Sequence, residues 1–144
     1  MYPHADYVVV NISSPNTAGL RALQDRGPLV RLLSAVAAAN RDVAGGPVPL
    51  LLKVAPDLAP SQLADIVAVV GETGFSGIIA TNTTLRRDGL PPAAADLRGG
   101  ASGAILTPRS TEIVRHIARV TGGRLPIIGV GGIMNADDAR AKLD

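Results

Sequence analysis

The sequence predicts an α/β fold with parallel strands, and three observations support this. Four short apolar runs lie at 7–12, 49–55, 76–82 and 126–132. They are rich in β-branched residues and apolar on both faces, as is typical of buried parallel strands. Helical patterns separate the runs, and polar or glycine residues lie at the carboxyl end of each run. Strands that alternate with helices in this way indicate a parallel α/β architecture.

Apolar residues at helical spacing predict a helix after each of the first three runs. The three stripes are Leu29, Leu32, Leu33 and Val36; Leu63, Ile66, Val67 and Val70; and Ile113, Ile117 and Val120. Gly71 and Gly74 supply stop signals for the second helix, and Thr107-Pro108 and Gly122-Gly123 bound the third. A further helix is expected to begin within 135–144.

The polar strand ends favour a barrel over an open doubly wound sheet. They are Asn11-Ile12-Ser13-Ser14, Lys53, Thr81-Asn82-Thr83-Thr84 and Gly131-Gly132. Barrel enzymes collect one contribution from each strand at this face, whereas a doubly wound sheet concentrates its chemistry at one switch point. We therefore expect residues 1–144 to form a single domain that is part of a (β/α)8 TIM barrel. A complete barrel takes about 250 residues, so we also expect a fragment of a longer chain.

Composition argues against several classes of function. Two Tyr, one Phe and no Trp leave little for base stacking, so nucleic-acid binding is not expected. The sequence has no Cys and no convergent carboxylates, so no metal is expected; His4 and His116 are interpreted as surface residues. No run approaches the roughly 20 apolar residues of a membrane span, and no signal peptide is evident. We expect a soluble chain, with an anchor elsewhere in a longer parent left open.

Lys53 is the cation whose placement demands a partner. It lies inside the second apolar run, whereas Lys142 lies in a polar terminal segment. Burying an ammonium is unfavourable unless an anion faces it. The alternatives are an ion pair, for example with Asp57, and an anionic cofactor.

Two further segments carry candidate chemistry. Residues 11–24 crowd amides and hydroxyls at a strand exit, where they can fix a planar heterocycle, although Ser-Pro-Asn is also ordinary turn chemistry. Glycines within 129–132 suit a phosphate site after a barrel strand, or a plain strand-to-helix turn. The irregular segment 85–106 is a candidate lid.

Four ordered motifs give this pattern a family resemblance. NISSPNTAGLRALQ at 11–24 resembles the signature of class 2 dihydroorotate dehydrogenases, and class 1 enzymes place Cys where Ser14 stands. Three more segments agree in order and spacing: LLKVAPDL at 51–58, IIATNTT at 78–84 with GGASG at 99–103, and PIIGVGGI at 126–133. The resemblance covers essentially the whole chain.

The resemblance implies oxidation of dihydroorotate to orotate in UMP synthesis, with FMN as hydride acceptor and a quinone as final acceptor. Ser14 would remove the C5 proton, with Thr17 beside it as a relay. The implied substrate contacts are Asn11, Asn16, Asn82 and Thr83. The implied cofactor contacts are Asn11, Lys53, Thr81, Ser102, Gly103, Gly131 and Gly132.

The chain also departs from the family pattern. The family's amino-terminal membrane-associated region with its quinone tunnel, the first three barrel strands and the last strand have no counterpart here. Ala104-Ile105-Leu106 stands where many relatives have a Lys-Pro-Leu-like sequence. A full-length parent would be peripheral to a membrane. The alternatives are a truncated, non-catalytic chain that at most binds flavin or phosphate weakly, and another FMN barrel acting on a related pyrimidine.

Overall fold

The computed structural model describes residues 4–17, 19–94 and 96–144, and its centre is a four-stranded parallel sheet. The strands are β1 (Val8–Asn11), β2 (Leu50–Val54), β3 (Gly77–Ala80) and β4 (Ile127–Gly129). Their order in the sheet is β1-β2-β3-β4, and every neighbouring pair is parallel. A doubly wound sheet would reverse its strand order at a switch point. The sheet therefore has barrel order, as predicted.

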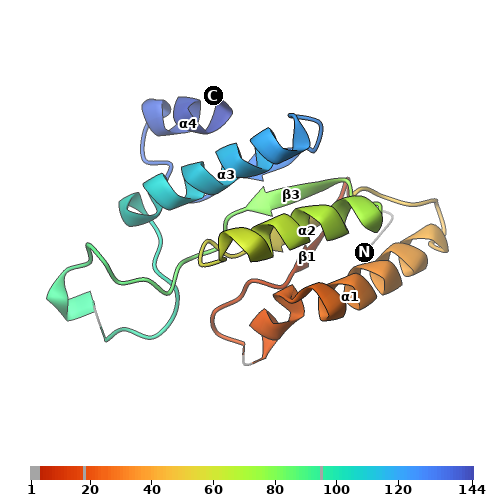
Figure 1. Ribbon diagram of the computed structural model, residues 1–144, viewed down its shortest axis with the longest axis horizontal. Helices are drawn as coiled ribbons and strands as arrows, with labels where there is room; N and C mark the ends of the chain where they lie inside the picture. Colours follow the sequence, from red (N-terminus) through yellow and green to blue (C-terminus); the bar gives the residue numbers. More distant parts are fainter. Residues whose placement is uncertain (1–3, 18, 95) are drawn as a thin grey trace.

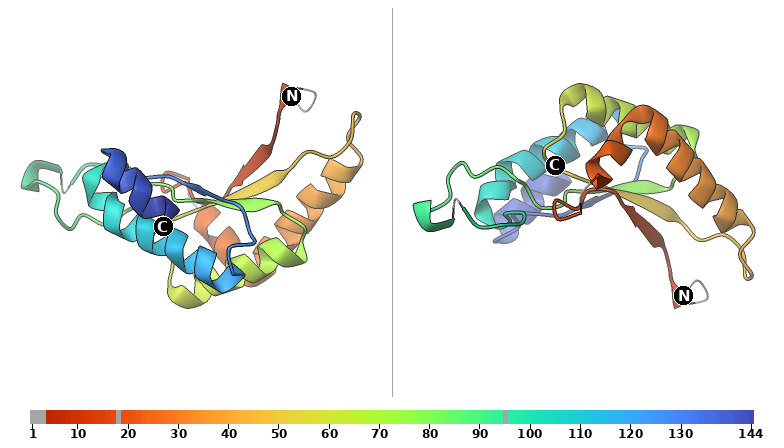
Figure 2. Two further views of the ribbon diagram at one scale, coloured as in Figure 1. Left: turned by 90° about the horizontal axis from the view of Figure 1, so that it is seen from above. Right: turned by 90° about the horizontal axis from the view of Figure 1, so that it is seen from below.

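In the ranges that the structure describes, four α-helices and the 3₁₀ helices η2, η3 and η4 connect and flank the strands (Figure 1). The α-helices are α1 (Arg26–Arg41), α2 (Pro60–Glu72), α3 (Thr107–Thr121) and α4 (Ala136–Leu143). The 3₁₀ helices are η2 (Leu20–Gln24), η3 (Pro92–Ala94) and η4 (Ala104–Leu106). Figure 2 shows α1, α2 and α3 together on one side of the strands. Right-handed crossovers between strands in sequential order place their helices on one face in this way.

The two faces of the sheet therefore differ in character. Side chains alternate along a strand, so the row that contains Leu52 and Ile78 faces the helices, and both residues are fully buried there. The neighbouring row contains Asn11, Lys53 and Ile79 and belongs to the face without helices. Polar residues near the carboxyl ends of the strands are thus presented on an open face, whereas the core lies on the other.

The helix boundaries agree with the predicted start and stop signals. Pro108 lies in the first turn of α3, and Gly122 ends that helix in the left-handed conformation. Asn135 caps α4 by accepting a hydrogen bond from the Asp138 N–H.

Val120, predicted to lie on the buried face of its helix, is 50% exposed, because the last turn of α3 is not fully covered by other elements. The prediction that the strands are buried on both faces is also wrong for β1 and β4, since Val9 and Ile128 are 36% and 37% exposed on the face without helices.

The prediction that Lys53 is a buried cation is wrong, and the buried lysine is Lys142, which lies in the polar terminal segment. Lys142 is 9% exposed, whereas Lys53 is only half-buried. Because α4 packs on α3, the Lys142 ammonium donates to Ser110 Oγ at 2.6 Å and Thr111 Oγ1 at 2.9 Å. Burial lowers the pKa of Lys142. A polar neighbourhood in the sequence concealed a long side chain that spans the helix interface.

His116 is less exposed than the interpretation as a surface residue implies. Its ring is half-buried on α3, and its Nε2 is enclosed without a hydrogen-bond partner in the described part of the chain. His4 is exposed, as expected.

Replacing Ile78 with Ala tests the helix-covered core. Ile78 is fully buried in the central strand β3, so the substitution leaves a cavity and should lower the free energy of unfolding by about 2–5 kcal/mol. Val120→Ala is the control and should lower the free energy of unfolding by less than about 1 kcal/mol, because the Val120 side chain is half-exposed to solvent. Urea unfolding followed by circular dichroism measures both; equal losses would contradict this assignment of the core.

Candidate active site

The carboxyl ends of β1 and β3 are joined by hydrogen bonds between side chains. The Asn82 side-chain amide donates to Ser13 Oγ at 2.9 Å, and the Ser13 hydroxyl donates to Asn11 Oδ1 at 2.7 Å. Asn11 is paired in register with Lys53 on β2. Residues that are far apart in the sequence therefore meet at three neighbouring strand ends, as the barrel prediction requires.

Lys53 is a cation on the open face of the sheet. Within the ranges that the structure describes, its ammonium makes no hydrogen bond or ion pair with the protein. The Asp57 carboxylate accepts hydrogen bonds from the Thr84 hydroxyl and the Leu85 N–H. The alternative of an ion pair between Lys53 and Asp57 is thus not realised. A half-buried cation without a protein anion fits a site for an anionic ligand.

Ser14 lies in the turn that follows β1 and is half-buried. Its Oγ accepts a hydrogen bond from the Asn16 N–H at 3.3 Å, which leaves the hydroxyl proton available to another acceptor. Asn16 and Thr17 are exposed. The structure therefore places Ser14 directly beside the Asn11–Ser13–Asn82 cluster along the chain, with Asn16 and Thr17 at its solvent side.

Residues 85–94 and 96–100 belong to a flap that projects from the body of the protein (Figures 1 and 2). Thr84 and Ala101 close its base through two backbone hydrogen bonds of 3.0 and 2.7 Å. The Arg87 guanidinium donates to the carbonyl oxygens of Leu97 at 3.0 Å and Gly99 at 2.6 Å. The segment 85–106 is thus more ordered than the predicted irregular loop, because a bridge and an arginine tie it together and η3 and η4 lie within it.

The flap contacts the candidate substrate residues through its glycines. A Cβ built on Gly100 would overlap the Thr83 hydroxyl, and one on Gly99 would lie 3.7 Å from Asn16 Oδ1. Asn82 itself accepts a hydrogen bond from the Thr83 N–H at 2.8 Å. Gly100 is therefore required for the close approach of the flap to the end of β3.

The glycine turn after β4 packs against the start of α3. Gly131 and Gly132 have φ of +103° and +67°, and a Cβ on Gly132 would overlap the Thr107 backbone. Ser110 Oγ donates to the Gly131 carbonyl at 2.7 Å. Packing and positive φ explain these glycines, in agreement with the plain-turn alternative. Their N–H groups donate to no protein acceptor within the described ranges, and so they also fit an anion such as a phosphate.

The remaining predicted cofactor residues are in different environments. Thr81 is 1% exposed, and its hydroxyl donates to the Asn82 carbonyl at 3.0 Å. Ser102 is exposed and Gly103, with φ of +87°, is half-buried just before η4. The Thr81 side chain is therefore already engaged within the protein, whereas Ser102 and Gly103 lie in the chain just before η4, with Ser102 open to solvent.

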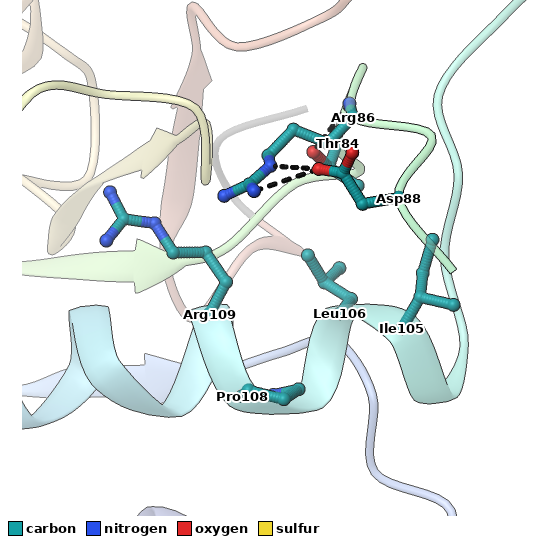
Figure 3. Close-up of a pocket in the computed structure, with 7 residues that line it drawn as sticks. All are labelled: Thr84, Arg86, Asp88, Ile105, Leu106, Pro108 and Arg109. Atoms are coloured by element: carbon teal, nitrogen blue, oxygen red, sulfur yellow. Dashed lines mark hydrogen bonds and ion pairs between the residues drawn. The ribbon is translucent and has the colours of Figure 1, made fainter. Parts of the chain in front are cut away.

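A separate pocket of about 180 Å³ lies between the flap and α3 (Figure 3). Arg86 on its wall forms an ion pair with Asp88 at 2.8 Å. Arg109 extends from α3 and donates to the carbonyls of Pro56 and Leu58 at 3.0 and 2.8 Å. Both guanidinium groups thus have partners, and the pocket is lined by none of the predicted site residues.

Two further features of the described residues bear on function. No group of three His, Asp or Glu side chains lies close enough together to hold a metal ion in the ranges 4–17, 19–94 and 96–144. Over the same ranges, no helix has the length and apolar character needed to cross a membrane.

The strand order is that of part of a β/α barrel, a class of protein whose active sites lie at the carboxyl ends of the strands. The family model for dihydroorotate dehydrogenase matches residues 1–144. The chain belongs to the dihydroorotate dehydrogenase family.

The curated relatives carry the name dihydroorotate dehydrogenase (quinone). The chain is 52% identical to the one from Parvibaculum lavamentivorans over 140 residues, which cover 96% of this chain and 39% of the relative. It is 48% identical to the one from Christiangramia forsetii over 144 residues, which cover 100% of this chain and 42% of the relative. This chain therefore spans about two fifths of the length of these relatives and resembles their quinone-dependent class.

The fold is also similar to solved structures of the family. A ligand-free dihydroorotate dehydrogenase from Eimeria tenella superposes with a TM-score of 0.90 at 36% identity, covering 96% of this chain and 43% of that one. The Eimeria enzyme in complex with ferulenol gives a TM-score of 0.88 at 36% identity, covering 96% and 42%. The four-stranded sheet is thus a segment of the family's barrel.

Sequence reasoning missed the part played by Ser13. This residue is fully buried and hydrogen-bonded to both Asn11 and Asn82, whereas only its neighbour Ser14 was expected to have a role. Residues two apart in an extended chain point to the same side, so Asn11 and Ser13 share a side of β1 and its extension. The two-residue periodicity of a strand could therefore have indicated that Ser13 lies beside Asn11.

Replacing Gly100 with Ala tests the contact between the flap and Thr83. The new methyl group would overlap the Thr83 side chain and push the flap outward. We expect hydrogen exchange at the Thr84 and Ala101 amides to become at least about tenfold faster, because an outward shift strains their mutual hydrogen bonds.

Gly71→Ala is the control for this substitution. A Cβ on Gly71 meets nothing within 4 Å, and its site on α2 tolerates alanine. Exchange at Thr84 and Ala101 should therefore stay unchanged. Unchanged exchange in Gly100→Ala as well would show that the flap does not rest on Thr83.

Proposed function

We propose that this chain forms the substrate-binding part of an FMN-dependent dihydroorotate dehydrogenase that oxidises dihydroorotate to orotate, with a quinone as the final electron acceptor. The observation that carries the proposal is the Asn11–Ser13–Asn82 cluster beside Lys53, at three neighbouring strand ends in a member of this family. A quinone acceptor would place the complete protein at a membrane surface. The names of the curated relatives support this acceptor.

The substrate offers carbonyl groups, ring N–H groups and a carboxylate, so it needs both donors and acceptors. Asn11, Asn16 and Asn82 supply amides, which can donate and accept, and Thr83 adds a hydroxyl. The approach of Gly100 to Thr83 supports a role for the flap in covering the bound ring. Several planar hydrogen-bonding groups around one ring would hold it in a single orientation.

Ser14 is the proposed base for the proton at C5. A serine hydroxyl is a weak base, so it must release its own proton to a relay as it accepts the substrate proton. Its Oγ already accepts from the Asn16 N–H, and Thr17 is the proposed next group in the relay. The flap would exclude bulk water and keep the proton transfer between these groups.

The cofactor contacts proposed here come from all four strand ends. When bound, FMN supplies the hydride acceptor for C6 of the substrate. Lys53 would hold the flavin ring where negative charge develops, together with Asn11 and Thr81. Ser102, Gly103, Gly131 and Gly132 would hold the phosphate end, and the unbonded N–H groups of the last two support this.

The first test uses a hybrid barrel, in which this chain replaces the matched segment of the Parvibaculum relative. We expect the hybrid to retain FMN and to reduce a quinone in a dihydroorotate-dependent reaction. Ser14→Ala in the hybrid should bind FMN normally yet slow flavin reduction by at least about 100-fold, because general-base catalysis contributes about 10²–10⁴. Single-turnover absorbance of the flavin measures this step.

Two results would contradict the proposal. A folded hybrid that contains FMN but does not respond to dihydroorotate would favour a flavin-binding scaffold, and a response only to another pyrimidine would favour a related oxidoreductase. Normal single-turnover reduction by Ser14→Ala would remove Ser14 from the role of base.

Lys53→Met in the hybrid tests the proposed cofactor contact. The change keeps the length of the side chain and removes the charge, so we expect FMN to dissociate about 10–100 times more readily, as for the loss of a hydrogen bond to a charged group. Lys53→Arg keeps the charge, so its FMN affinity should lie between that of the unsubstituted hybrid and that of Lys53→Met. Titration of the apo protein with FMN measures the affinity; an unchanged value for Lys53→Met would place Lys53 away from the cofactor.

A further inference from the structure

The side-chain amides of Asn11 and Asn82 are connected by a chain of hydrogen bonds that has only one direction. The Ser13 N–H lies 3.1 Å from one terminal atom of the Asn11 amide. A backbone N–H can only donate, so that atom must be the amide oxygen Oδ1. The Ser13 hydroxyl lies 2.7 Å from the same oxygen and must also donate to it.

The orientation of Asn82 follows from that of Asn11. The Ser13 hydroxyl donates its only proton to Asn11, so toward any other partner its oxygen can only accept. The Asn82 amide atom at 2.9 Å from this oxygen must therefore be the donor Nδ2. The other Asn82 atom is then Oδ1, and it faces the Thr83 N–H at 2.8 Å. Two backbone N–H groups, one at each end, therefore fix the polarity of the whole chain.

We propose that Ser13 is a positioning residue that locks both asparagines with their N–H groups turned toward the ligand. This inference rests on the proposed function, because it assigns the ligand-facing atoms of that same site. The Nδ2 of Asn11 makes no hydrogen bond in the part of the chain that the structure describes, and Asn82 retains one N–H beyond its bond to Ser13. The amide N–H groups of Asn11 and Asn82 that remain unbonded thus donate to the ligand. Asn16 and Thr83 are left to accept from its ring N–H groups.

This polarity selects the chemical edge that the site can bind. Up to three N–H bonds point to acceptor atoms of the ligand, such as a ring carbonyl or a carboxylate, and an N–H group of the ligand at those same positions would be disfavoured. Ser13 is fully buried, so water does not readily replace its hydroxyl. Without that hydroxyl, Asn82 loses the acceptor that directs its amide, and Asn11 is held by one bond instead of two.

Ser13→Ala in the FMN-loaded hybrid barrel tests the inference. Loss of two hydrogen bonds that orient ligand contacts should weaken orotate binding about tenfold and raise the KM for dihydroorotate by a similar factor. FMN affinity should fall by a clearly smaller factor, because Asn11, the cofactor contact that Ser13 orients, keeps its bond to the Ser13 N–H, and the Ser13 hydroxyl makes no hydrogen bond to Lys53 or Thr81. Orotate affinity is measured by its perturbation of the flavin absorbance.

Thr73→Ala is the matched control. It also removes a hydroxyl that makes one strong internal hydrogen bond, to the Val69 carbonyl at 2.7 Å, but it lies at the end of α2. Its thermal stability should fall without any change in orotate affinity. If the Ser13→Ala hybrid does not fold, Ser13→Cys replaces it. The thiol is a weak hydrogen-bonding group, so Ser13→Cys should weaken orotate binding by less than the tenfold expected for Ser13→Ala.

The outcomes separate this inference from the function it rests on. A hybrid with Ser13 intact that binds FMN but not orotate overturns both. A hybrid that binds orotate normally, with affinity unchanged by Ser13→Ala or by Ser13→Cys, overturns the positioning role alone. Equal losses of orotate and FMN affinity would also overturn it, because Ser13 would then support the fold in general.

Discussion

Parallel pairing of the four strands in sequence order is the constraint on which the candidate site depends. It brings the carboxyl ends of β1, β2 and β3 to one edge of the sheet and sets Asn11 opposite Lys53. It also sends α1, α2 and α3 to the same face, so the core forms there and the other face remains free for a ligand. A shift of register by one residue would turn these polar side chains into the apolar core.

Much of the fold was predictable because its signals are local. The four strands, the start of α3 at Thr107 and its end at Gly122 follow from apolar periodicity and from the conformational limits of proline and glycine. The barrel order follows from the distribution of polar strand ends. Val120 shows the limit of such reasoning, since periodicity defines a face of a helix but not how far along that face other elements reach.

The predictions that failed or were missed depend on contacts between segments that are distant in the sequence. Lys53 stands among apolar residues in the sequence yet is only half-buried, whereas Lys142 is buried because α4 packs on α3. Burial of a long side chain is decided by what packs over its stem, and the sequence gives no direct measure of this. The hydrogen bond from Asn82 to Ser13 joins residues 69 positions apart, so only the folded sheet reveals it.

The base of the flap has a consequence for how a ligand could enter. Thr84 is paired with Ala101 through its backbone, and its hydroxyl donates to Asp57 and accepts from the Arg86 N–H. The residue directly after Thr83 is thereby anchored to the loop that follows β2 as well as to the flap. Any swing of the outer flap would pivot beyond this anchor and leave Thr83 and Asn82 where they are. The outer flap would then govern how a ligand enters, and Asn82 and Thr83 would govern how it is oriented. The sequence of the outer flap could therefore change without altering the residues that orient the ligand.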